Sequence, residues 1–491
     1  MSAFRLPAGR FLPQAAAALV LALLLLVVVR LPWAGDLGMH AATVQRLRHS
    51  LLNPGNPLVD TDTPSPYYSP WTLLLGALAR LTGLPVFAVL RVAAVAGLAL
   101  LVTGVWRYVR TLSAHRAAPA LALLCLLFLW GPELFEWSGF LGLNSLALTV
   151  SYPSVCALGL SFHLWAWLAP AVRGGAQRWV WPGLGALWAV ILLVHQFSGV
   201  VASLGALATV AAARPGRRVV ARLGAGLLLG LVVLWAWPYY DFFALLTAGA
   251  DLDAVHRSLY RQLSGRFGLV LLGVAALVPR WRRDHRDPLV LFFALGALVF
   301  AVGGASGHYA WGRALPAALI PAQLAAALEA LPVEGRTRAV RTGWACALAA
   351  ALAVGAWTQA GTLGYVVPRG ALPQAVAEKY RTPWAGYRWI TPWVRYGDIV
   401  MARVSVSRQI PAYGPYTVAP GYPDVFLPDE RRRDDAVRRY FAAGTAGDER
   451  RRIVGAYRVR WVVDTGVAAR GAGLREVARG PGGQVLYAVR R

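Results

Sequence analysis

Cysteine is scarce in this chain: three occur in 491 residues, Cys125, Cys156 and Cys346. All three lie inside apolar stretches, and neither a Cys-x-x-Cys pair nor a regular cysteine–histidine spacing accompanies them. The sequence therefore argues against a disulfide framework and against a structural zinc site. Acidic residues are also few, 23 against 49 basic ones, and the formal net charge is +26.

Apolar residues dominate the composition. They make up 57% of the chain, which also contains 20 tryptophans and has a mean hydropathy of +0.50. This composition is typical of a polytopic membrane protein. In a soluble protein such positive charge would indicate nucleic-acid binding, but here the arginines lie mainly in short links between apolar runs and in the C-terminal region. We interpret them as residues that orient helices and contact anionic lipid, and we expect no nucleic-acid partner.

Apolar runs recur along most of the chain. By the length needed to cross a hydrocarbon core of roughly 30 Å, they predict about eleven spans. The first run, residues 11–31, is interpreted as a retained signal anchor, because it is long and many further membrane segments follow. The runs centre near Ala22, Ala96, Leu124, Leu160, Ala186, Leu207, Gly230, Val270, Leu295, Leu319 and Ala350.

Charge in the links predicts the topology. Arg5 and Arg10 precede the first run, so the N-terminus is expected in the cytoplasm. The same rule assigns five basic links to the cytoplasm: residues 107–116, 173–178, 214–222, 280–286 and 336–341. The sequence thus predicts a multi-pass protein of the cytoplasmic (inner) membrane.

One apolar segment, residues 71–84, is roughly 14 residues long and therefore short for a span. Counting it as a span would place residues 107–116 outside the cell. We therefore expect it to be a surface helix in the first outward loop.

The composition changes after the last span. Residues 381–491 are rich in charge, proline, tyrosine and glycine, with short β-rich runs at residues 399–406 and 457–463. A helix is predicted over residues 429–442, with an apolar face for packing on a sheet. We therefore expect an all-α membrane domain, residues 1–363, and a small extracytoplasmic α/β domain, residues 364–491.

Several stretches carry a resemblance to a known family. GDLGMHAATVQRL (residues 35–47) follows the first span, and the turn-rich NPGNPLVDTDTPSPYYSPW and TLLLGALARLTGLPVF come after it. HYAWGRALP enters a late span, and the tail contains YGPYTVAPGYPDVF. In this order the chain resembles bacterial polytopic glycosyltransferases of the C-type superfamily, in an uncharacterised branch.

The resemblance implies a function. Such enzymes move a sugar from a polyprenyl-phosphate donor to a cell-envelope acceptor, which is a glycan, lipid or protein, on the outer face of the membrane. Hexosyl and pentosyl transfer are both open, and inversion by direct displacement is the expected stereochemistry. Characterised members often carry Asp-Asp or Asp-Glu where this chain has Asp36 with His40.

The chemistry of such a transfer needs a base for the acceptor hydroxyl and a cation for the leaving phosphate. Asp36 is the candidate base, and His40 lies four residues later on the same face of a predicted helix. The alternative is that Asp36 only caps that helix. Arg313, assisted by His308, is the candidate for the donor phosphate. Its alternative is an arginine that extends to the membrane interface beside Trp311.

Other candidates are less specific. His195, Gln196 and Tyr152 are predicted to face an acceptor cavity, with a helix-capping histidine as the alternative for His195. Glu133 and Glu136 are three residues apart, so on a helix they would share a face and could hold Mg²⁺ or Mn²⁺. Their alternative is two solvated loop acids.

Two rival functions stay open. A transporter or flippase of lipid-linked saccharide would also use intramembrane histidine and arginine, although the sequence shows no repeated halves. A non-catalytic envelope assembly protein of the same fold is the other, since fold alone does not establish chemistry.

Overall fold

The structure is a computed structural model that describes residues 11–246, 249–332, 337–465 and 473–490. Its chain forms two compact units. Unit 1 consists of Met1–Pro32, Ala94–Ala236 and Gly249–Thr382, and unit 2 consists of Trp33–Ala93, Trp237–Ala248 and Pro383–Arg491. Arg5, Arg10 and the start of the link at residues 336–341, which entered the topology argument, lie outside the described residues.

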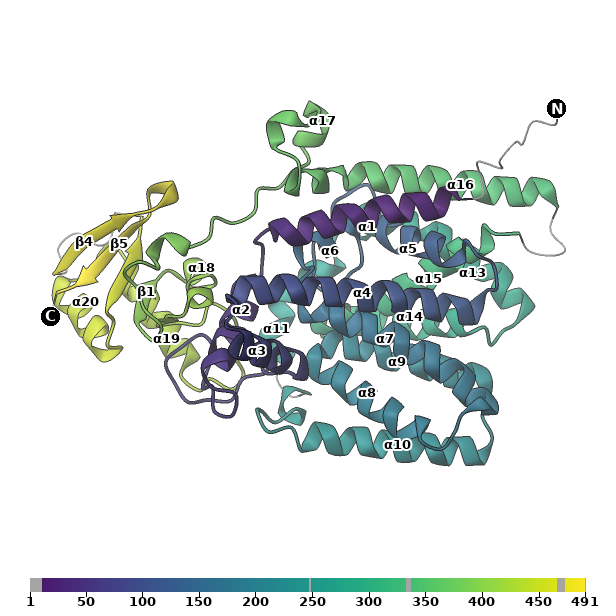
Figure 1. Ribbon diagram of the computed structural model, residues 1–491, viewed down its shortest axis with the longest axis horizontal. Helices are drawn as coiled ribbons and strands as arrows, with labels where there is room; N and C mark the ends of the chain where they lie inside the picture. The colour runs from purple at the N-terminus through teal and green to yellow at the C-terminus, as the bar shows by residue number, and fades with distance from the viewer. Residues whose placement is uncertain (1–10, 247–248, 333–336, 466–472, 491) are drawn as a thin grey trace. The chain divides into compact units, whose positions relative to one another are not determined.

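Unit 1 is a bundle of helices that run side by side with nearly parallel axes (Figure 1). In the described ranges, eight helical segments are long and apolar enough to cross a membrane. The protein is therefore a multi-pass membrane protein. These segments contain α1 (Leu12–Arg30), α4 (Val86–Leu112, which begins in unit 2), α7 (Pro153–Pro170), α9 (Gln196–Ala213), α10 (Arg217–Trp235), α13 (Leu271–Arg283), α14 (Pro288–Ser306) and α16 (Arg338–Thr358).

The fold class agrees with the sequence, whereas the number of full-length spans is smaller than the predicted eleven. Each predicted apolar run contains a helix, but three of these helices are shorter: α5 (Ala118–Phe128), α8 (Val180–Val194) and α15 (Pro316–Glu329). The remaining helices of unit 1 are η1 (Ala171–Gly175), α6 (Leu143–Leu148), α11 (Gly249–His256), η3 (Arg257–Tyr260), α12 (Leu263–Phe267), η4 (Gly268–Val270), η5 (Tyr309–Ala314), η6 (Ala360–Tyr365), η7 (Arg369–Ala371) and α17 (Gln374–Ala377).

Small residues let these helices approach closely. A Cβ on Gly185 of α8 would overlap the backbone of Gly226 on α10, and a Cβ on Gly296 of α14 would overlap the backbone of Ala317 on α15. Between helices in lipid the hydrophobic effect contributes little, so such close backbone contact supplies much of the attraction. Larger side chains at these glycines would separate the helix pairs.

Buried amides complete the hydrogen bonding where α5 ends. The Nε2 atom of Gln359 donates to the carbonyl of Leu127 at 2.8 Å, and the Nε2 atom of Gln323 donates to the carbonyl of Leu129 at 2.8 Å. Carbonyls at a helix C-terminus have no partner within their own helix, and leaving them unpaired in an apolar interior is costly. These two bonds fix the start of the loop that follows α5.

An ion cluster joins α13, α14 and α15. Arg280 Nη2 lies 2.7 Å from Asp287 Oδ2, and Arg280 Nη1 lies 3.4 Å from Glu329 Oε1. Arg283 also pairs with Glu329, whose side chain is 1% exposed. Because the Glu329 carboxylate is buried and needs a paired cation, the cluster holds the three helix ends together.

Unit 2 contains a five-stranded mixed sheet with the order β2-β1-β3-β5-β4. β1 pairs in parallel with β2 and β3, whereas β5 pairs antiparallel with β3 and β4. The strands are β1 (Ile399–Ala402), β2 (Tyr416–Thr417), β3 (Trp461–Asp464), β4 (Leu474–Arg479) and β5 (Val485–Val489). The helices of the tail are η8 (Arg388–Ile390), α18 (Val404–Ser407), η9 (Ile410–Tyr413), α19 (Glu430–Phe441), α20 (Gly447–Ala456) and η10 (Pro481–Gly483).

The predicted α/β tail is confirmed, with shifts at its strands. The helix predicted over residues 429–442 is α19, and its buried face is formed by Ala436, Val437, Tyr440 and Phe441 as the sequence indicates. The strand predicted over residues 399–406 ends at Ala402, and the short helix α18 follows.

The loop that follows α1 is part of unit 2. It forms α2 (Leu37–His49) and α3 (Pro70–Thr82), and η2 (Phe243–Leu246) belongs to the same unit. The segment predicted as a surface helix is thus the 13-residue α3, whose N-terminus is closed by a capping box at Ser69. The sequence-based domains, 1–363 and 364–491, follow chain order and stay a prediction, whereas packing joins residues 33–93 to the tail.

Arg46 of α2 joins this loop to the tail. Its side chain is fully buried, and its guanidinium donates to the carbonyls of Pro57 at 3.3 Å, Gly414 at 2.7 Å and Pro415 at 2.7 Å. The guanidinium carbon also lies 3.6 Å from the centre of the Tyr416 ring. A planar group with several fixed donors suits this arrangement, which a lysine cannot reproduce.

We expect Arg46→Met to lower the free energy of unfolding of unit 2 by about 3 kcal/mol, because three carbonyls lose their donor in the interior. Unfolding of the purified protein in detergent measures the change. Arg48→Met is the matched control, because Arg48 lies on the same helix, is half-buried and makes one bond, to the carbonyl of Gly83 at 3.1 Å. Equal losses for the two variants would contradict this role of Arg46.

Candidate functional site

Asp36 stands at the N-cap of α2, after a turn in which Gly35 has φ +48°. The backbone N–H of His40 donates to the carbonyl of Asp36 at 3.1 Å, so the predicted four-residue helical spacing is confirmed. The side chain of Asp36 makes no capping hydrogen bond to the helix. Capping, the alternative interpretation of this residue, therefore does not engage its carboxylate.

Two tyrosines lie near Asp36. Burial raises the pKa of Tyr422, and the nearby Asp36 carboxylate raises it further. Burial likewise raises the pKa of Tyr67, with the carboxylates of Asp424 and Asp36 adding to the effect. Asp36 thus lies within electrostatic reach of two phenol groups, one from the first loop and one from the tail.

Sequence reasoning missed Asp424, an acid of this same region. It is buried, and its Oδ2 accepts a hydrogen bond of 2.8 Å from the Nδ2 of the equally buried Asn56. The Oδ1 of Asp424 accepts from the N–H of Phe426 at 3.1 Å. Burial raises the pKa of Asp424, and these hydrogen bonds oppose that rise. The sequence signal that could have indicated Asp424 is its position as an acid among apolar and aromatic residues in GYPDVF.

Burial lowers the pKa of His40 to about 3. Its imidazole is therefore neutral at neutral pH, and it can accept a hydrogen bond but does not supply a positive charge. The predicted orienting pair of Asp36 and His40 stays a prediction.

Arg313, in unit 1, is a buried residue of η5. Its guanidinium carbon lies 4.7 Å from the ring centre of Phe197 and 5.4 Å from that of Trp137. The predicted role of Arg313 and its alternative, an arginine that extends to the membrane interface beside Trp311, both stay predictions. The backbone N–H of Ala310 donates to the Oδ1 of Asp253 at 2.7 Å and thereby anchors the segment that carries Arg313.

His195 lies close to Arg313. Gly139, which has φ +84°, lies beside both residues. A Cβ on Gly139 would lie 3.5 Å from His195 Cε1 and 3.7 Å from Arg313 Nη2. His195 also caps α9, because its Nδ1 accepts from the N–H of Ser198 at 3.1 Å. The capping alternative for His195 is therefore realised, and the same residue borders the arginine.

His256 belongs to the same cluster. It is buried, and its ring centre lies 5.5 Å from that of Trp137 and 5.4 Å from that of Phe197. We call Trp137, His195, Phe197, His256 and Arg313 the arginine cluster.

The other predicted residues of unit 1 are more scattered. His308 is exposed, and its ring lies beside Trp311. Gln196 is a half-buried residue at the start of α9, and Tyr152 is buried at the N-cap of α7. None of these positions tests the predicted role of His308 at the donor phosphate or of Gln196 and Tyr152 at the acceptor, so those roles stay predictions.

The expectation that Glu133 and Glu136 share a helical face is wrong. The loop between α5 and α6 is not helical at either residue. The backbone N–H of Glu133 donates to the carbonyl of Gly265 at 2.9 Å, whereas Glu136 accepts from Asn144 Nδ2 at 2.8 Å and pairs with Arg381 at 3.1 Å. Proline at position 132 and the bonds to distant residues favour an irregular loop here.

A metal centre is not evident in the described ranges, where no group of three or more His, Cys, Asp or Glu side chains is placed to hold a metal ion. The Mg²⁺ or Mn²⁺ suggested for Glu133 and Glu136 stays a prediction.

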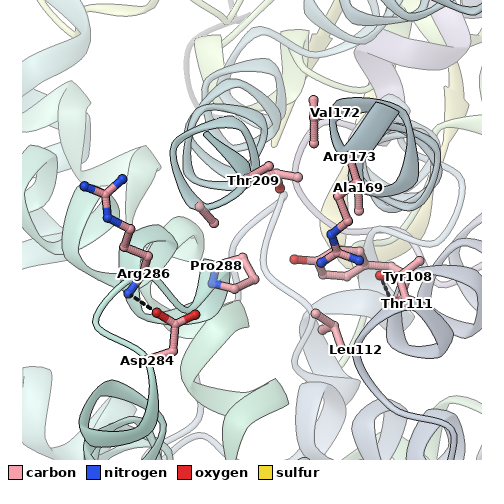
Figure 2. Close-up of a pocket in the computed structure, with 12 residues that line it drawn as sticks. Tyr108, Thr111, Leu112, Ala169, Val172, Arg173, Thr209, Asp284, Arg286 and Pro288 are labelled. Atoms are coloured by element: carbon pink, nitrogen blue, oxygen red, sulfur yellow. Dashed lines mark hydrogen bonds between the residues drawn. The ribbon is translucent and has the colours of Figure 1, made fainter. Parts of the chain in front are cut away.

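A cavity of about 100 Å³ lies elsewhere in unit 1, at the ends of α4, α7 and α9 and at the turn before α14 (Figure 2). Arg173, Asp284 and Arg286 are its charged lining residues, and none of the predicted site residues lines it. Because three helix C-termini converge there, the arginines are placed to offset the negative ends of those helices.

Comparison with known proteins identifies the fold. No protein-family model and no curated protein sequence matches the chain. Among solved structures, the arabinofuranosyltransferase AftD from Mycobacteria matches with a TM-score of 0.60 and 18% identity over 97% of this chain. ArnT from Cupriavidus metallidurans, bound to undecaprenyl phosphate, matches with a TM-score of 0.55 and 16% identity, over 96% of this chain and 98% of that chain.

These similarities establish a shared fold. They confirm the predicted polytopic membrane fold, and they leave both the superfamily and its branch a prediction. The chain spans 40% of the length of the AftD chain that it matches, so what the whole of that protein does is not carried over.

We expect the free energy of unfolding to fall as the pH falls below about 6.5, the ordinary pKa of histidine. In that range the unfolded chain binds a proton at His40, whereas the folded protein, in which the pKa of His40 is about 3, does not. The slope from this residue is at most about 1.4 kcal/mol per pH unit. Thermal unfolding of wild type and His40→Gln between pH 7.5 and pH 5 (roughly the window of the histidine titration) measures it. The variant loses this slope, whereas the exposed-histidine control His285→Gln keeps it. Parallel curves for wild type and His40→Gln would contradict the assignment.

Proposed function

We propose that the protein is a membrane glycosyltransferase. It moves a sugar from a polyprenyl-phosphate donor to a cell-envelope acceptor on the outer face of the cytoplasmic membrane, with its C-terminal region outside the cell. The observation that carries the proposal is the shared fold with ArnT bound to undecaprenyl phosphate, which extends over 96% of this chain. The eight apolar spans and the arginine cluster support it.

Asp36 is the base in this proposal. The acceptor hydroxyl oxygen attacks the anomeric carbon, the bond from that carbon to the phosphate oxygen breaks, and its electron pair stays on the phosphate. The hydroxyl proton passes to the Asp36 carboxylate. The Asp36 side chain makes no capping bond to α2 and lies within electrostatic reach of Tyr422, which supports this role.

Arg313 is the residue proposed for the donor phosphate. A guanidinium can donate two parallel hydrogen bonds to a phosphate, and the rings of Trp137 and Phe197 flank the Arg313 guanidinium. His195 and Gly139 lie beside the same guanidinium. The arrangement suits an anionic group of small size.

We expect Asp36→Asn to lower turnover by a factor of about 10² to 10⁴, because an amide keeps the shape but accepts no proton. Mass spectrometry of lipid-linked sugars and envelope glycans compares cells with wild type, no protein or the variant. Both altered strains should accumulate one polyprenyl-linked sugar and lose one glycan. Asp62→Asn, an exposed acid of the same loop, is the control and should behave as wild type.

Two outcomes of that experiment would count against the proposal. If the strain without the protein accumulates no lipid-linked sugar, the glycosyltransferase proposal fails. If it does accumulate the sugar and Asp36→Asn does not, Asp36 is not the base, and the transporter or assembly alternative gains support.

We expect Arg313→Lys to weaken binding of undecaprenyl phosphate by roughly tenfold or more, because lysine offers a point charge without the bidentate geometry or the stacking. Binding to the purified protein in nanodiscs measures the affinity. Arg257→Lys is the matched control, because Arg257 also lies over an aromatic ring, that of Tyr309 at 5.5 Å, and is exposed. Equal affinities for wild type and Arg313→Lys would remove Arg313 from this role.

A further inference from the structure

We propose that Tyr422, in the C-terminal tail, is a positioning residue for Asp36. Its hydroxyl holds the turn from which the Asp36 side chain projects, so that the tail takes part in the chemistry instead of serving only as an appended domain. This inference rests on the proposed function, in which Asp36 is the base.

The hydrogen bond is direct and local. The hydroxyl of Tyr422 donates to the carbonyl of Gly35 at 2.9 Å, one residue before Asp36. Gly35 has φ +48°, a backbone conformation that permits a sharp turn but leaves it with few restraints of its own. The peptide that carries this carbonyl is the one that leads into Asp36, so the bond restrains the direction of the Asp36 side chain.

The phenol is itself fixed on the tail side. Tyr422 is 8% exposed and packs with Met39, Ala42, Leu58 and Leu427. The guanidinium of Arg408 lies 5.0 Å from its ring centre, while Arg408 Nε donates to the carbonyl of Gly421 at 2.8 Å. A ring held on several sides is a rigid support for the bond that its hydroxyl makes.

Backbone contact reinforces the same turn. A Cβ on Gly38, two residues after Asp36, would overlap the carbonyl of Arg408, so α2 lies directly against the tail at its first turn. Tyr67 approaches from the first loop, and its hydroxyl lies 3.4 Å from the carbonyl of Pro423. The segment of Asp36 therefore contacts the tail before and after Asp36, at Gly35 through the Tyr422 hydroxyl and at Gly38 through the backbone of Arg408.

Replacing Tyr422 by phenylalanine removes one hydroxyl and keeps the packed ring. A small displacement of a reacting group costs far more in rate than in stability. We expect kcat to fall by about tenfold or more, with the KM for the donor unchanged within roughly twofold. Membranes of the strain lacking the protein supply donor and acceptor, and consumption of the lipid-linked sugar that accumulates there is followed by mass spectrometry.

Tyr68→Phe is the matched control. Tyr68 is also a buried tyrosine of unit 2, and its hydroxyl donates to the carbonyl of Gly55 at 2.7 Å. Both variants lose one buried bond from a phenol to a backbone carbonyl, so their melting temperatures should fall by similar amounts. Only Tyr422→Phe should lose turnover.

A double variant separates positioning from general damage. If Tyr422 acts through Asp36, then Tyr422→Phe combined with Asp36→Asn should be no slower than Asp36→Asn alone, because the group being positioned is already lost. The inference would be overturned if the loss of turnover in the double variant were the product of the losses in the two single variants. Equal turnover for Tyr422→Phe and Tyr68→Phe would also overturn it. Failure of the wild-type protein to consume any lipid-linked sugar would instead overturn the proposed function.

Discussion

The buried guanidinium of Arg46 is the interaction on which unit 2 depends. It satisfies three backbone carbonyls, two of which lie more than 360 residues away along the chain, and it stacks on the ring of Tyr416. A buried charge with this many partners tolerates little displacement. It thereby fixes α2 against the tail, and the position of α2 decides where Asp36 begins the helix and which tail residues can reach it.

The sequence was informative wherever the signal is local. Apolar length gives the helices of unit 1, and the spacing of Ala436, Val437, Tyr440 and Phe441 gives α19. The helical interval between Asp36 and His40 follows from the same reasoning. Helix length was harder to predict. Helices such as α5 and α15 are largely buried by neighbouring helices, and an apolar run that is buried in this way can form a helix shorter than a full membrane span.

The rest depends on contacts between distant segments. Asn56 and Asp424 are 368 residues apart, and no periodicity connects them. Glu133 and Glu136 have a helical interval but lie in a loop whose backbone bonds to Gly265, so a local pattern was overridden by a remote partner. The surroundings of Arg313 were likewise invisible, because Trp137, Phe197 and His256 come from three different segments that only folding brings to one guanidinium.

Unit 2 is built from segments that lie far apart in the sequence, and this affects the time course of its folding during synthesis. Arg46 leaves the ribosome long before Gly414 and Pro415, since 368 residues separate it from the nearer of them. At about 5–20 residues per second, α2 waits roughly 20–70 s for its acceptors. During that interval a guanidinium destined for a dry interior stays hydrated, and the apolar face of α2 has no tail to cover it. Throughout that interval the nascent first loop is thus exposed to misfolding and to proteases.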